Sequence, residues 1–149
     1  MRACTREDLP RWLVLRQALW PAEADEHLGE MSSFLDEPER FAQFLALDVD
    51  GKVLGLVEAA LRHDYVNGTD SSPVAFLEGL YVAPDARRQG VAVGLVAAVE
   101  DWARERGCHE LASDAALGNV TSHATHCALG FEETERVVYF RKHLAKGAG

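Results

Sequence analysis

Residues 74–107 constrain the fold of this chain more than any other stretch. They read VAFLEGLYV, then APDARRQG, then VAVGLVAAVEDWARERG. The first segment is rich in branched and aromatic residues, as buried strands are. The last has the spacing of an amphipathic helix and ends at Gly107, a residue type favoured just after a helix. A strand, a short loop and a long helix in this order predict a sheet with a crossover connection.

The loop between that strand and that helix carries the most specific chemical signal, RRQGVA at residues 87–92. The first backbone N–H groups of a helix lack intrahelical partners, and the positive end of the helix dipole lies beside them, so an anion is expected there. Gly90 permits a tight turn and close backbone approach, while Arg87 and Arg88 add charge suited to phosphate. An ordinary helix start with arginines nearby is the alternative. The loop lacks the patterns of nucleoside-triphosphate and dinucleotide sites, so both are disfavoured.

The remaining segments complete an element order. Residues 5–21 begin with a Thr-x-x-Asp capping pattern and continue as an apolar helix until Pro21. A second helix is expected over residues 38–46, and two strands are expected within residues 44–62 around the turn Asp50-Gly51. A short strand over 109–115, a helix over 119–130 and a final strand over 134–144 follow. This order predicts an α+β fold with a mixed, mostly antiparallel central sheet and flanking helices.

Length and composition indicate a single domain, expected over residues 1–145, with a flexible tail at residues 146–149. The sequence has no run of about 18 apolar residues to span a bilayer and no apolar secretory signal at its start, so a cytoplasmic location is expected. Its three cysteines are widely spaced and predict neither a disulfide framework nor a thiolate zinc site. The formal net charge of −9 disfavours nucleic acid and suits a cationic ligand, while acidity that serves only solubility is an equal alternative.

The motif Arg87-x-x-Gly90-x-Ala92 after an apolar strand resembles the signature of the Gcn5-related N-acetyltransferases, and the element order resembles their fold over nearly the whole chain. The resemblance implies acetyl-coenzyme A as the co-substrate, with its pyrophosphate on the loop amides. It also implies a parallel pair of strands that splay apart at a bulge, which Gly79 would tolerate. The co-substrate-binding residues implied are Leu80, Tyr81, Val82, Arg87, Arg88, Gln89, Gly90, Val91, Ala92, Val93 and Asn119.

Three segments narrow this resemblance: LRHDYVNGTDSSPVAFLEGLYV, ASDA followed by Asn119, and LGFEETERVVYFRK. Together they are similar to the aminoglycoside 6′-N-acetyltransferases, whose substrates carry several ammonium groups. A carboxylate-lined cleft attracts such a substrate and binds its amines by charge-assisted hydrogen bonds. The substrate-binding residues implied are Trp20, Glu23, Asp25, Tyr65, Asp70, Glu78 and Asp114. For the acidic stretch at residues 23–30, a solvated charged loop is the plainer interpretation.

The polar tract RHDYVNGTDSSP at residues 62–73 separates two apolar strands and is far longer than the turn they need. Its Asn67-Gly68 pair alone would suffice for a hairpin. A substrate with several ammonium groups would explain the surplus of polar residues, because the tract leads directly into the strand that carries Glu78. We therefore expect it to form one wall of the substrate site.

Glu78 lies inside an apolar strand, where an unpaired carboxylate is costly, so it is either ion-paired or faces a wet site. It is the first choice for the general base that deprotonates the substrate ammonium, and Asp114 is the second. Backbone N–H groups near Leu80 are expected to stabilise the oxyanion. Many relatives have a tyrosine general acid where this sequence has His126, so His126, Tyr139 and unassisted departure of the thiolate all stay open.

Other functions also stay open at this point. A polyamine or a peptide amine as substrate keeps the same chemistry, whereas a non-catalytic acyl-coenzyme A-binding module keeps only the phosphate loop. The final strand is long and apolar for an exposed edge, which predicts a homodimer. No metal site is expected, because His123 and His126 have i, i+3 spacing with no acidic residue to act as a third ligand in their motif.

Overall fold

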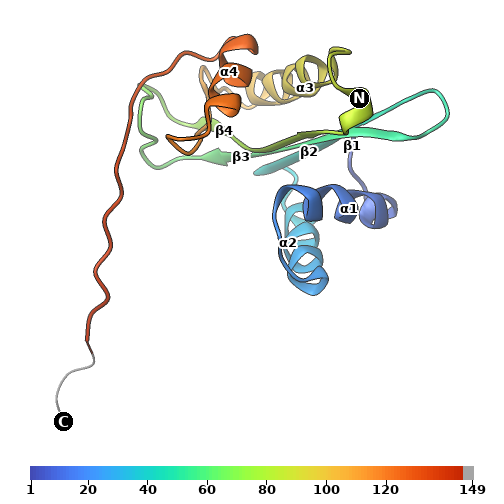
Figure 1. The fold of residues 1–149 in the computed structure, drawn as a ribbon, viewed down its shortest axis with the longest axis horizontal. Helices are drawn as coiled ribbons and strands as arrows, with labels where there is room; N and C mark the ends of the chain where they lie inside the picture. Colours follow the sequence, from blue (N-terminus) through green and yellow to red (C-terminus); the bar gives the residue numbers. More distant parts are fainter. Residues whose placement is uncertain (146–149) are drawn as a thin grey trace.

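The computed structural model describes residues 1–145 and contains one five-stranded sheet with the strand order β1-β2-β3-β4-β5. The first four strands pair antiparallel, and β4 and β5 pair parallel. This arrangement confirms the expected α+β fold with a mixed, mostly antiparallel sheet (Figure 1). The strands are β1 (Arg2–Ala3), β2 (Phe41–Leu47), β3 (Val53–Arg62), β4 (Val74–Val82) and β5 (Leu111–Ala112).

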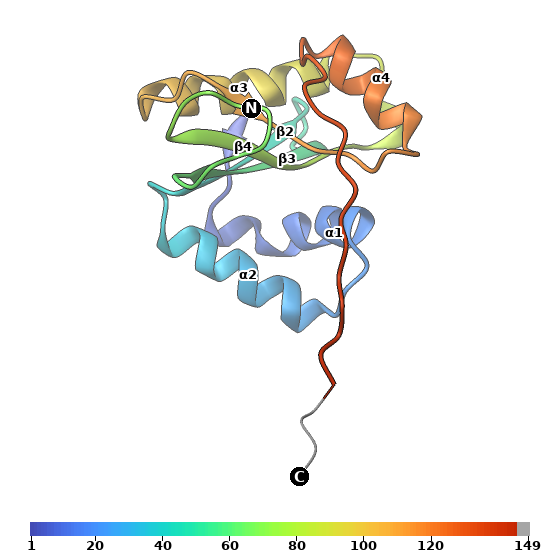
Figure 2. The same ribbon diagram turned by 90° about the vertical axis from the view of Figure 1, so that its left-hand side faces the viewer.

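Helices cover both faces of the sheet. Helices α1 (Leu9–Leu19) and α2 (Ala24–Asp36) lie on one face, and α3 (Val91–Glu105) and α4 (Val120–Ala128) lie on the other (Figures 1 and 2). Two short 3-10 helices, Arg6–Asp8 and Pro84–Ala86, precede α1 and α3 respectively. None of the helices in residues 1–145 is long and apolar enough to cross a membrane.

The sheet has an apolar core on each face, because successive side chains of a strand point to opposite faces. In β3, Val57 packs in the core under α3 while the adjacent Leu56 packs in the core against α1 and α2. Both side chains are fully buried, which explains why β3 reads as a continuous apolar run rather than an alternating one. The largest fully buried apolar side chains are Trp12, Met31, Leu45, Leu56 and Leu95.

The helix predicted over residues 38–46 is wrong, because residues 41–47 form strand β2. Phe41, Phe44 and Leu45 have helical spacing, but β2 has helices on both of its faces, and a strand covered on both faces needs no alternation. The first helix is confirmed as the 3-10 turn followed by α1. The strands around Asp50-Gly51, strand β4, helix α3 and helix α4 are confirmed as well.

Helix α2 was missed, because residues 23–30 were interpreted as a charged loop. Its inward positions nevertheless have helical spacing, with His27 and Met31 buried four residues apart. Four acidic side chains concealed this pattern within α2, since only part of one face contacts the protein. Helix α2 contributes Glu26, His27, Glu30 and Phe34 to the lining of the cleft described below.

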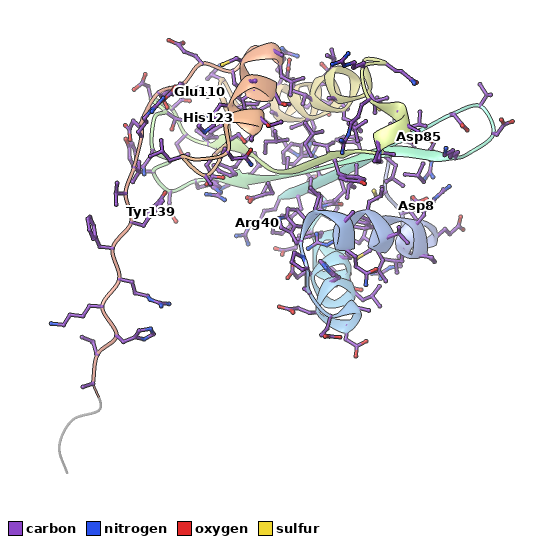
Figure 3. The ribbon with its side chains drawn as sticks, viewed as in Figure 1. Asp8, Arg40, Asp85, Glu110, His123 and Tyr139 are labelled. Carbon is purple, nitrogen blue, oxygen red and sulfur yellow. The ribbon has the colours of Figure 1, made fainter. Side chains whose placement is uncertain are left out.

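The final strand predicted over residues 134–144 is not formed within this chain. Residues 132–145 have no strand or helix assignment and are exposed throughout. They extend away from the sheet, and Tyr139 lies on this extended segment at a distance from the helices (Figure 3). A strand needs a pairing partner, which the described chain does not supply here. The flexible tail expected at residues 146–149 lies outside the described residues.

Asp8, at the start of α1, is a buried carboxylate with two cationic partners. Its Oδ1 lies 2.7 Å from a guanidinium nitrogen of Arg2 and 2.5 Å from one of Arg11, and its Oδ2 accepts the Thr5 N–H at 2.8 Å. Figure 3 labels Asp8 at this corner of the molecule. The hydrogen bond from Arg2, assisted by Thr5 and Arg11, holds the pKa of Asp8 well below its usual range.

We expect Asp8→Asn to remove a pH-dependent part of the stability. Because the Asp8 pKa is depressed by folding, its contribution is fully present above about pH 5 and is lost as the pH falls further, and it amounts to roughly 2 kcal/mol at pH 7. The variant should therefore unfold at lower urea than the wild type at pH 7, and the difference should shrink towards pH 3. Urea titrations at pH 7, 5 and 3.5 check this. Parallel pH profiles of the two proteins would contradict it.

Candidate active site

A cleft of about 550 Å³ lies between α1, α2 and the strands β2, β3 and β4. Its lining is aromatic and acidic, and it includes four glutamates. Such a lining suits a ligand that has both a ring surface and positive charge. The lining residues are Arg16, Trp20, Ala22, Glu26, His27, Glu30, Phe34, Phe41, Gln43, Glu58, Ala59, Ala60 and Glu78.

A β-bulge in β4 directs Glu78 into this cleft. Glu58 of β3 pairs with Gly79 and the next residue, Ala59, pairs with Leu77, so Glu78 has no partner on β3. An extra residue in one strand bends that strand and changes the direction of its side chain. The bulge expected at Gly79 is therefore present, with Glu78 as the extra residue.

Glu78 is both ion-paired and exposed. The sequence left open whether it is ion-paired or faces a wet site, and both descriptions apply. Its Oε1 accepts a hydrogen bond from Arg62 at 2.8 Å, and Arg62 in turn stacks 3.6 Å above the ring of Phe76. The side chain stays 36% exposed and lines the cleft. Since one oxygen binds Arg62, the other is free to contact a ligand.

The ring of Trp20 covers Gly79 directly. A Cβ atom at position 79 would lie 2.4 Å from Cη2 of Trp20, far inside van der Waals contact. Glycine is therefore required at this position for a steric reason as well as for the bulge. Trp20 and Glu78 thus meet at one end of the cleft.

We expect Gly79→Ala to displace the Trp20 ring. The overpacking should cost about 1 to 3 kcal/mol of stability and should weaken ligand binding in the cleft. Gly29→Ala in α2 is a matched control, because a Cβ there meets nothing within 4 Å and alanine favours a helix by up to about 1 kcal/mol. Thermal melts of both variants check the contrast, and equal melting temperatures would count against the steric role of Gly79.

The floor of the cleft holds a buried charged pair that the sequence analysis missed. Arg16 of α1 forms an ion pair with Glu58 of β3, and both side chains are almost fully buried. The indole N–H of Trp12 donates to the other oxygen of Glu58 at 2.8 Å. Burial raises the pKa of the Glu58 carboxyl, and the charge of Arg16 opposes this rise. A glutamate inside the apolar run VLGLVEAALR was the sequence signal that could have indicated this pair.

The structure brings together only some of the residues expected to bind a substrate. Trp20 and Glu78 line the cleft, whereas Glu23 lies at the N-cap of α2 and Asp25 is exposed in its first turn, and neither lines it. Asp114 is exposed just after β5, also outside the lining. The acidic residues of the cleft that sequence reasoning did not assign are Glu26, Glu30 and Glu58.

Tyr65 and Asp70 lie in the polar tract, which packs against the β5 side of the sheet. The backbone N–H of Asp70 donates to Glu110 at 2.9 Å, and the Ser71 hydroxyl donates to the same carboxylate. Thr69 and Ser72 donate to carbonyls within the tract. Much of its polarity is thus used to close the loop on itself, while the Tyr65 ring is 76% exposed.

The phosphate loop has the backbone expected of an anion site. Gly90 is the N-cap of α3 with a φ of 77°, and Arg88 also has a positive φ of 64°. The Gly94 N–H bonds the Gly90 carbonyl at 3.0 Å, which leaves the N–H groups of residues 91–93 at the open end of the helix. Arg87 donates to the Val82 carbonyl at 3.2 Å and so holds the loop to the end of β4.

The parallel strands β4 and β5 separate next to this loop. Their pairing covers only Ala75 with Leu111 and Phe76 with Ala112. Beyond the bulge, β4 continues through Leu80, Tyr81 and Val82 with β3 as its only strand partner among the described residues. A gap therefore opens along β4 from Glu78 to the N-terminus of α3, which confirms the splayed pair.

His126 of α4 contacts the end of β5. Its Nε2 lies 2.8 Å from the Ser113 hydroxyl, and its Nδ1 lies 2.7 Å from the Ser122 carbonyl. Because a carbonyl only accepts, Nδ1 carries the proton, and Nε2 of the neutral ring accepts from Ser113. Neutral His126 therefore has no proton to give from Nε2. Asn119 caps α4 by accepting the Ser122 N–H at 3.1 Å.

A family model described as acetyltransferase (GNAT) family matches residues 6–131. The chain belongs to this acetyltransferase family. Helix α3 with its phosphate loop and the splayed strands β4 and β5 are thus parts of a GNAT domain.

Two relatives within the family are similar over almost their entire length. An aminoglycoside N(6′)-acetyltransferase type 1 of Serratia marcescens is 53% identical over 142 residues, which cover 95% of this chain and 97% of that protein. One of Stenotrophomonas maltophilia is 52% identical over 148 residues, which cover 99% and 95%. The likeness thus includes the cleft and the C-terminal segment as well as the phosphate loop.

Two solved acetyltransferase structures are also similar to this chain over nearly its whole length. A crystal structure of an aminoglycoside antibiotic 6′-N-acetyltransferase of Acinetobacter baumannii superimposes with a TM-score of 0.92 at 50% identity, covering 96% of this chain and 97% of that one. AAC(6′)-Iy in complex with the bisubstrate analogue CoA-S-monomethyl-acetylneamine superimposes with a TM-score of 0.90 at 46% identity, covering 96% and 97%. The fold of a known coenzyme A-binding acetyltransferase therefore extends over this chain.

Proposed function

We propose that this protein transfers the acetyl group of acetyl-coenzyme A to the 6′-amine of aminoglycoside antibiotics, and so confers resistance to them. The observation that carries the proposal is an acidic, aromatic cleft that meets the gap between β4 and β5 at Glu78. Relatives about half identical over nearly the whole chain are aminoglycoside N(6′)-acetyltransferases. The charge of the cleft and the activity of the relatives agree on a polycationic substrate.

The residues of the phosphate loop and of β4 fit acetyl-coenzyme A. Its pyrophosphate is assigned to the N–H groups from Arg88 to Val93, where the start of α3 is open and Gly90 allows close approach. Its pantetheine arm is assigned to the gap beside Leu80, Tyr81 and Val82, where backbone groups lack a second strand. The co-substrate supplies an acetyl group activated as a thioester. Gln89 and Asn119 are also assigned to acetyl-coenzyme A binding, on the basis of the family resemblance alone.

Glu78 is assigned as the group that takes the proton from the substrate ammonium, directly or through a water. The bulge points it into the cleft, Arg62 orients it, and its second oxygen is free. Asp114 is the second choice, because it follows β5 at the far side of the gap. His126 is kept as a candidate acid only in its protonated form, since Nε2 of the neutral ring accepts from Ser113.

The substrate itself is assigned to the cleft, with Trp20 against a sugar ring and Glu78 beside the reacting amine. Glu23, Asp25, Tyr65 and Asp70 are assigned to outer contacts of a substrate that extends beyond the cleft. Their exposure leaves them available for such contacts. The absence of a membrane-spanning helix in residues 1–145 fits a cytoplasmic enzyme.

Release of coenzyme A with acetyl-coenzyme A and kanamycin or tobramycin tests the function. We expect turnover with both antibiotics, and raised resistance in a susceptible bacterium that expresses the protein. Spermidine and an unmodified peptide N-terminus serve as competing amines in the same assay. If the protein acetylates only spermidine or only the peptide, its substrate is a polyamine or a peptide amine and not an aminoglycoside. Coenzyme A binding without any turnover would indicate a non-catalytic module.

We assign the C-terminal segment to a homodimer contact. Val138, Tyr139 and Phe140 are 69%, 81% and 93% exposed on a segment that pairs with no strand among residues 1–145. Apolar residues in an extended segment are suited to add a strand to a second copy. Sedimentation at micromolar concentration should give a dimer, and deletion of residues 132–149 should give monomers. A wild type that sediments as a monomer would contradict the contact.

A further inference from the structure

Arg16 connects three structural elements beneath the cleft. Its guanidinium pairs with Glu58 of β3, donates to Glu30 of α2 at 2.6 Å, and donates through Nε to Nδ1 of His27 at 3.1 Å. The side chain is only 3% exposed, so these contacts use nearly all of its surface. Five fixed donors on a planar group make arginine suited to such a junction, and lysine cannot reproduce it.

His27 extends the junction to Trp20. Because Arg16 can only donate, Nδ1 of His27 accepts, and its Nε2 donates to the Trp20 carbonyl at 2.9 Å. The guanidinium also lies 4.9 Å from the centroid of the Trp20 ring, within range of a cation–π contact. Arg16 thus holds Trp20 through its backbone, by way of His27, and through its ring.

The same guanidinium sets the charges of the cleft. Glu58 on the floor is almost fully buried, and an unpaired carboxylate at such depth would take up a proton. Glu30 on the wall is 51% exposed, and its contact with Arg16 fixes the direction of its carboxylate. Both glutamates line the cleft together with Glu78.

We propose that Arg16 is a positioning residue of the aminoglycoside cleft, which holds the Glu58 and Glu30 carboxylates and seats the Trp20 ring over Gly79 beside Glu78. This inference rests on the proposed function for its substrate, and on the contacts of Arg16 alone for its geometry. Arg16 touches neither the acetyl-coenzyme A gap nor the phosphate loop. Its removal should therefore affect the amine substrate and spare the co-substrate.

The test uses the double variant Arg16→Met/Glu58→Gln, since it removes both buried charges and leaves none unpaired. We expect it to fold, to lose roughly 10- to 100-fold in kcat/KM for kanamycin, and to keep KM for acetyl-coenzyme A within about twofold. Arg16→Lys keeps the charge and loses the planar guanidinium. It should also lower kcat/KM for kanamycin, by a smaller factor than the double variant does. Arg104→Met/Glu100→Gln removes both charges of an exposed ion pair on α3 and is the matched control.

A second measurement needs no substrate. The indole N–H resonance of Trp20, assigned with Trp20→Phe, should shift in the double variant, while that of Trp102 stays in place. Wild-type kanamycin kinetics and an unmoved Trp20 resonance in a folded double variant would overturn the inference. A wild type that acetylates no aminoglycoside would instead refute the proposed function, and the Trp20 resonance would then decide the positioning role by itself. If the double variant does not fold, the same two readouts on Arg16→Lys decide it.

Discussion

Replacement of Glu78 by glutamine is expected to lower kcat/KM for aminoglycoside acetylation by roughly 10²- to 10⁴-fold, the range for loss of a general base. The amide keeps the size of the side chain and can still contact Arg62, but it cannot take the proton of the substrate ammonium. The fold should be unaffected, because Glu78 is exposed and lies in a bulge that does not depend on its charge. Kinetics with kanamycin and thermal melts measure both effects.

Two further variants complete this experiment. Glu100→Gln, which alters a glutamate of α3 in contact with Arg104, is the control and should behave as the wild type. Asp114→Asn tests the second choice for the base. If Glu78→Gln keeps the full rate and Asp114→Asn loses most of it, Asp114 is the general base. If both variants keep the full rate, neither residue is the general base.

The second large effect is expected from Ala92→Asp at the start of α3. A carboxylate in the first turn suits the helix dipole, so the stability should be unchanged or slightly increased. The same charge competes for the open N–H groups that we assign to the pyrophosphate. KM for acetyl-coenzyme A should therefore rise by roughly 10- to 100-fold, as loss of one charge-assisted hydrogen bond implies.

Ala97→Asp is the matched control, because Ala97 is exposed on the same helix away from its N-terminus. It adds an equal charge and should leave KM for acetyl-coenzyme A near the wild-type value. Calorimetry with coenzyme A gives the same comparison without turnover. Equal affinities in both variants and the wild type would show that the co-substrate does not bind at this helix terminus.

The sequence was most informative where local chemistry decides the structure. The glycine at the start of α3, the capping pattern before α1 and the turn at Asp50-Gly51 each depend on a few adjacent residues, and all three are confirmed. Strand β2 and helix α2 were misjudged, because their periodicity depends on which faces the rest of the protein covers. The final strand finds no partner strand among residues 1–145, and the sequence of the strand by itself does not reveal whether a partner exists.

The candidate site was predicted in part for the same reason. Trp20 and Glu78 were found, because a resemblance and a charged residue in an apolar strand indicated them. Glu26 and Glu30 were not assigned, since their common face exists only once residues 24–36 form a helix. The Arg16–Glu58 pair joins residues 42 positions apart, so the glutamate inside an apolar run indicates a buried partner but does not identify it.

The polar tract at residues 62–73 shows most clearly where prediction from the sequence ended. Its length and polarity were attributed to a ligand, yet Thr69, Ser71 and Ser72 bond within the tract or to Glu110. Tyr65 and Asp70 keep their proposed outer contacts, which Tyr65→Phe and Asp70→Asn would address through KM for larger aminoglycosides. The acidity that defines the cleft comes instead from α2 and β3, together with Glu78 of β4.

The most direct test is the position of the acetyl group in the product. Kanamycin should be incubated with the protein and acetyl-coenzyme A, and the purified product should be analysed by NMR. The account predicts a single acetyl group on the 6′-nitrogen. An acetyl group on any other nitrogen, or unmodified kanamycin after exhaustive incubation, would contradict it.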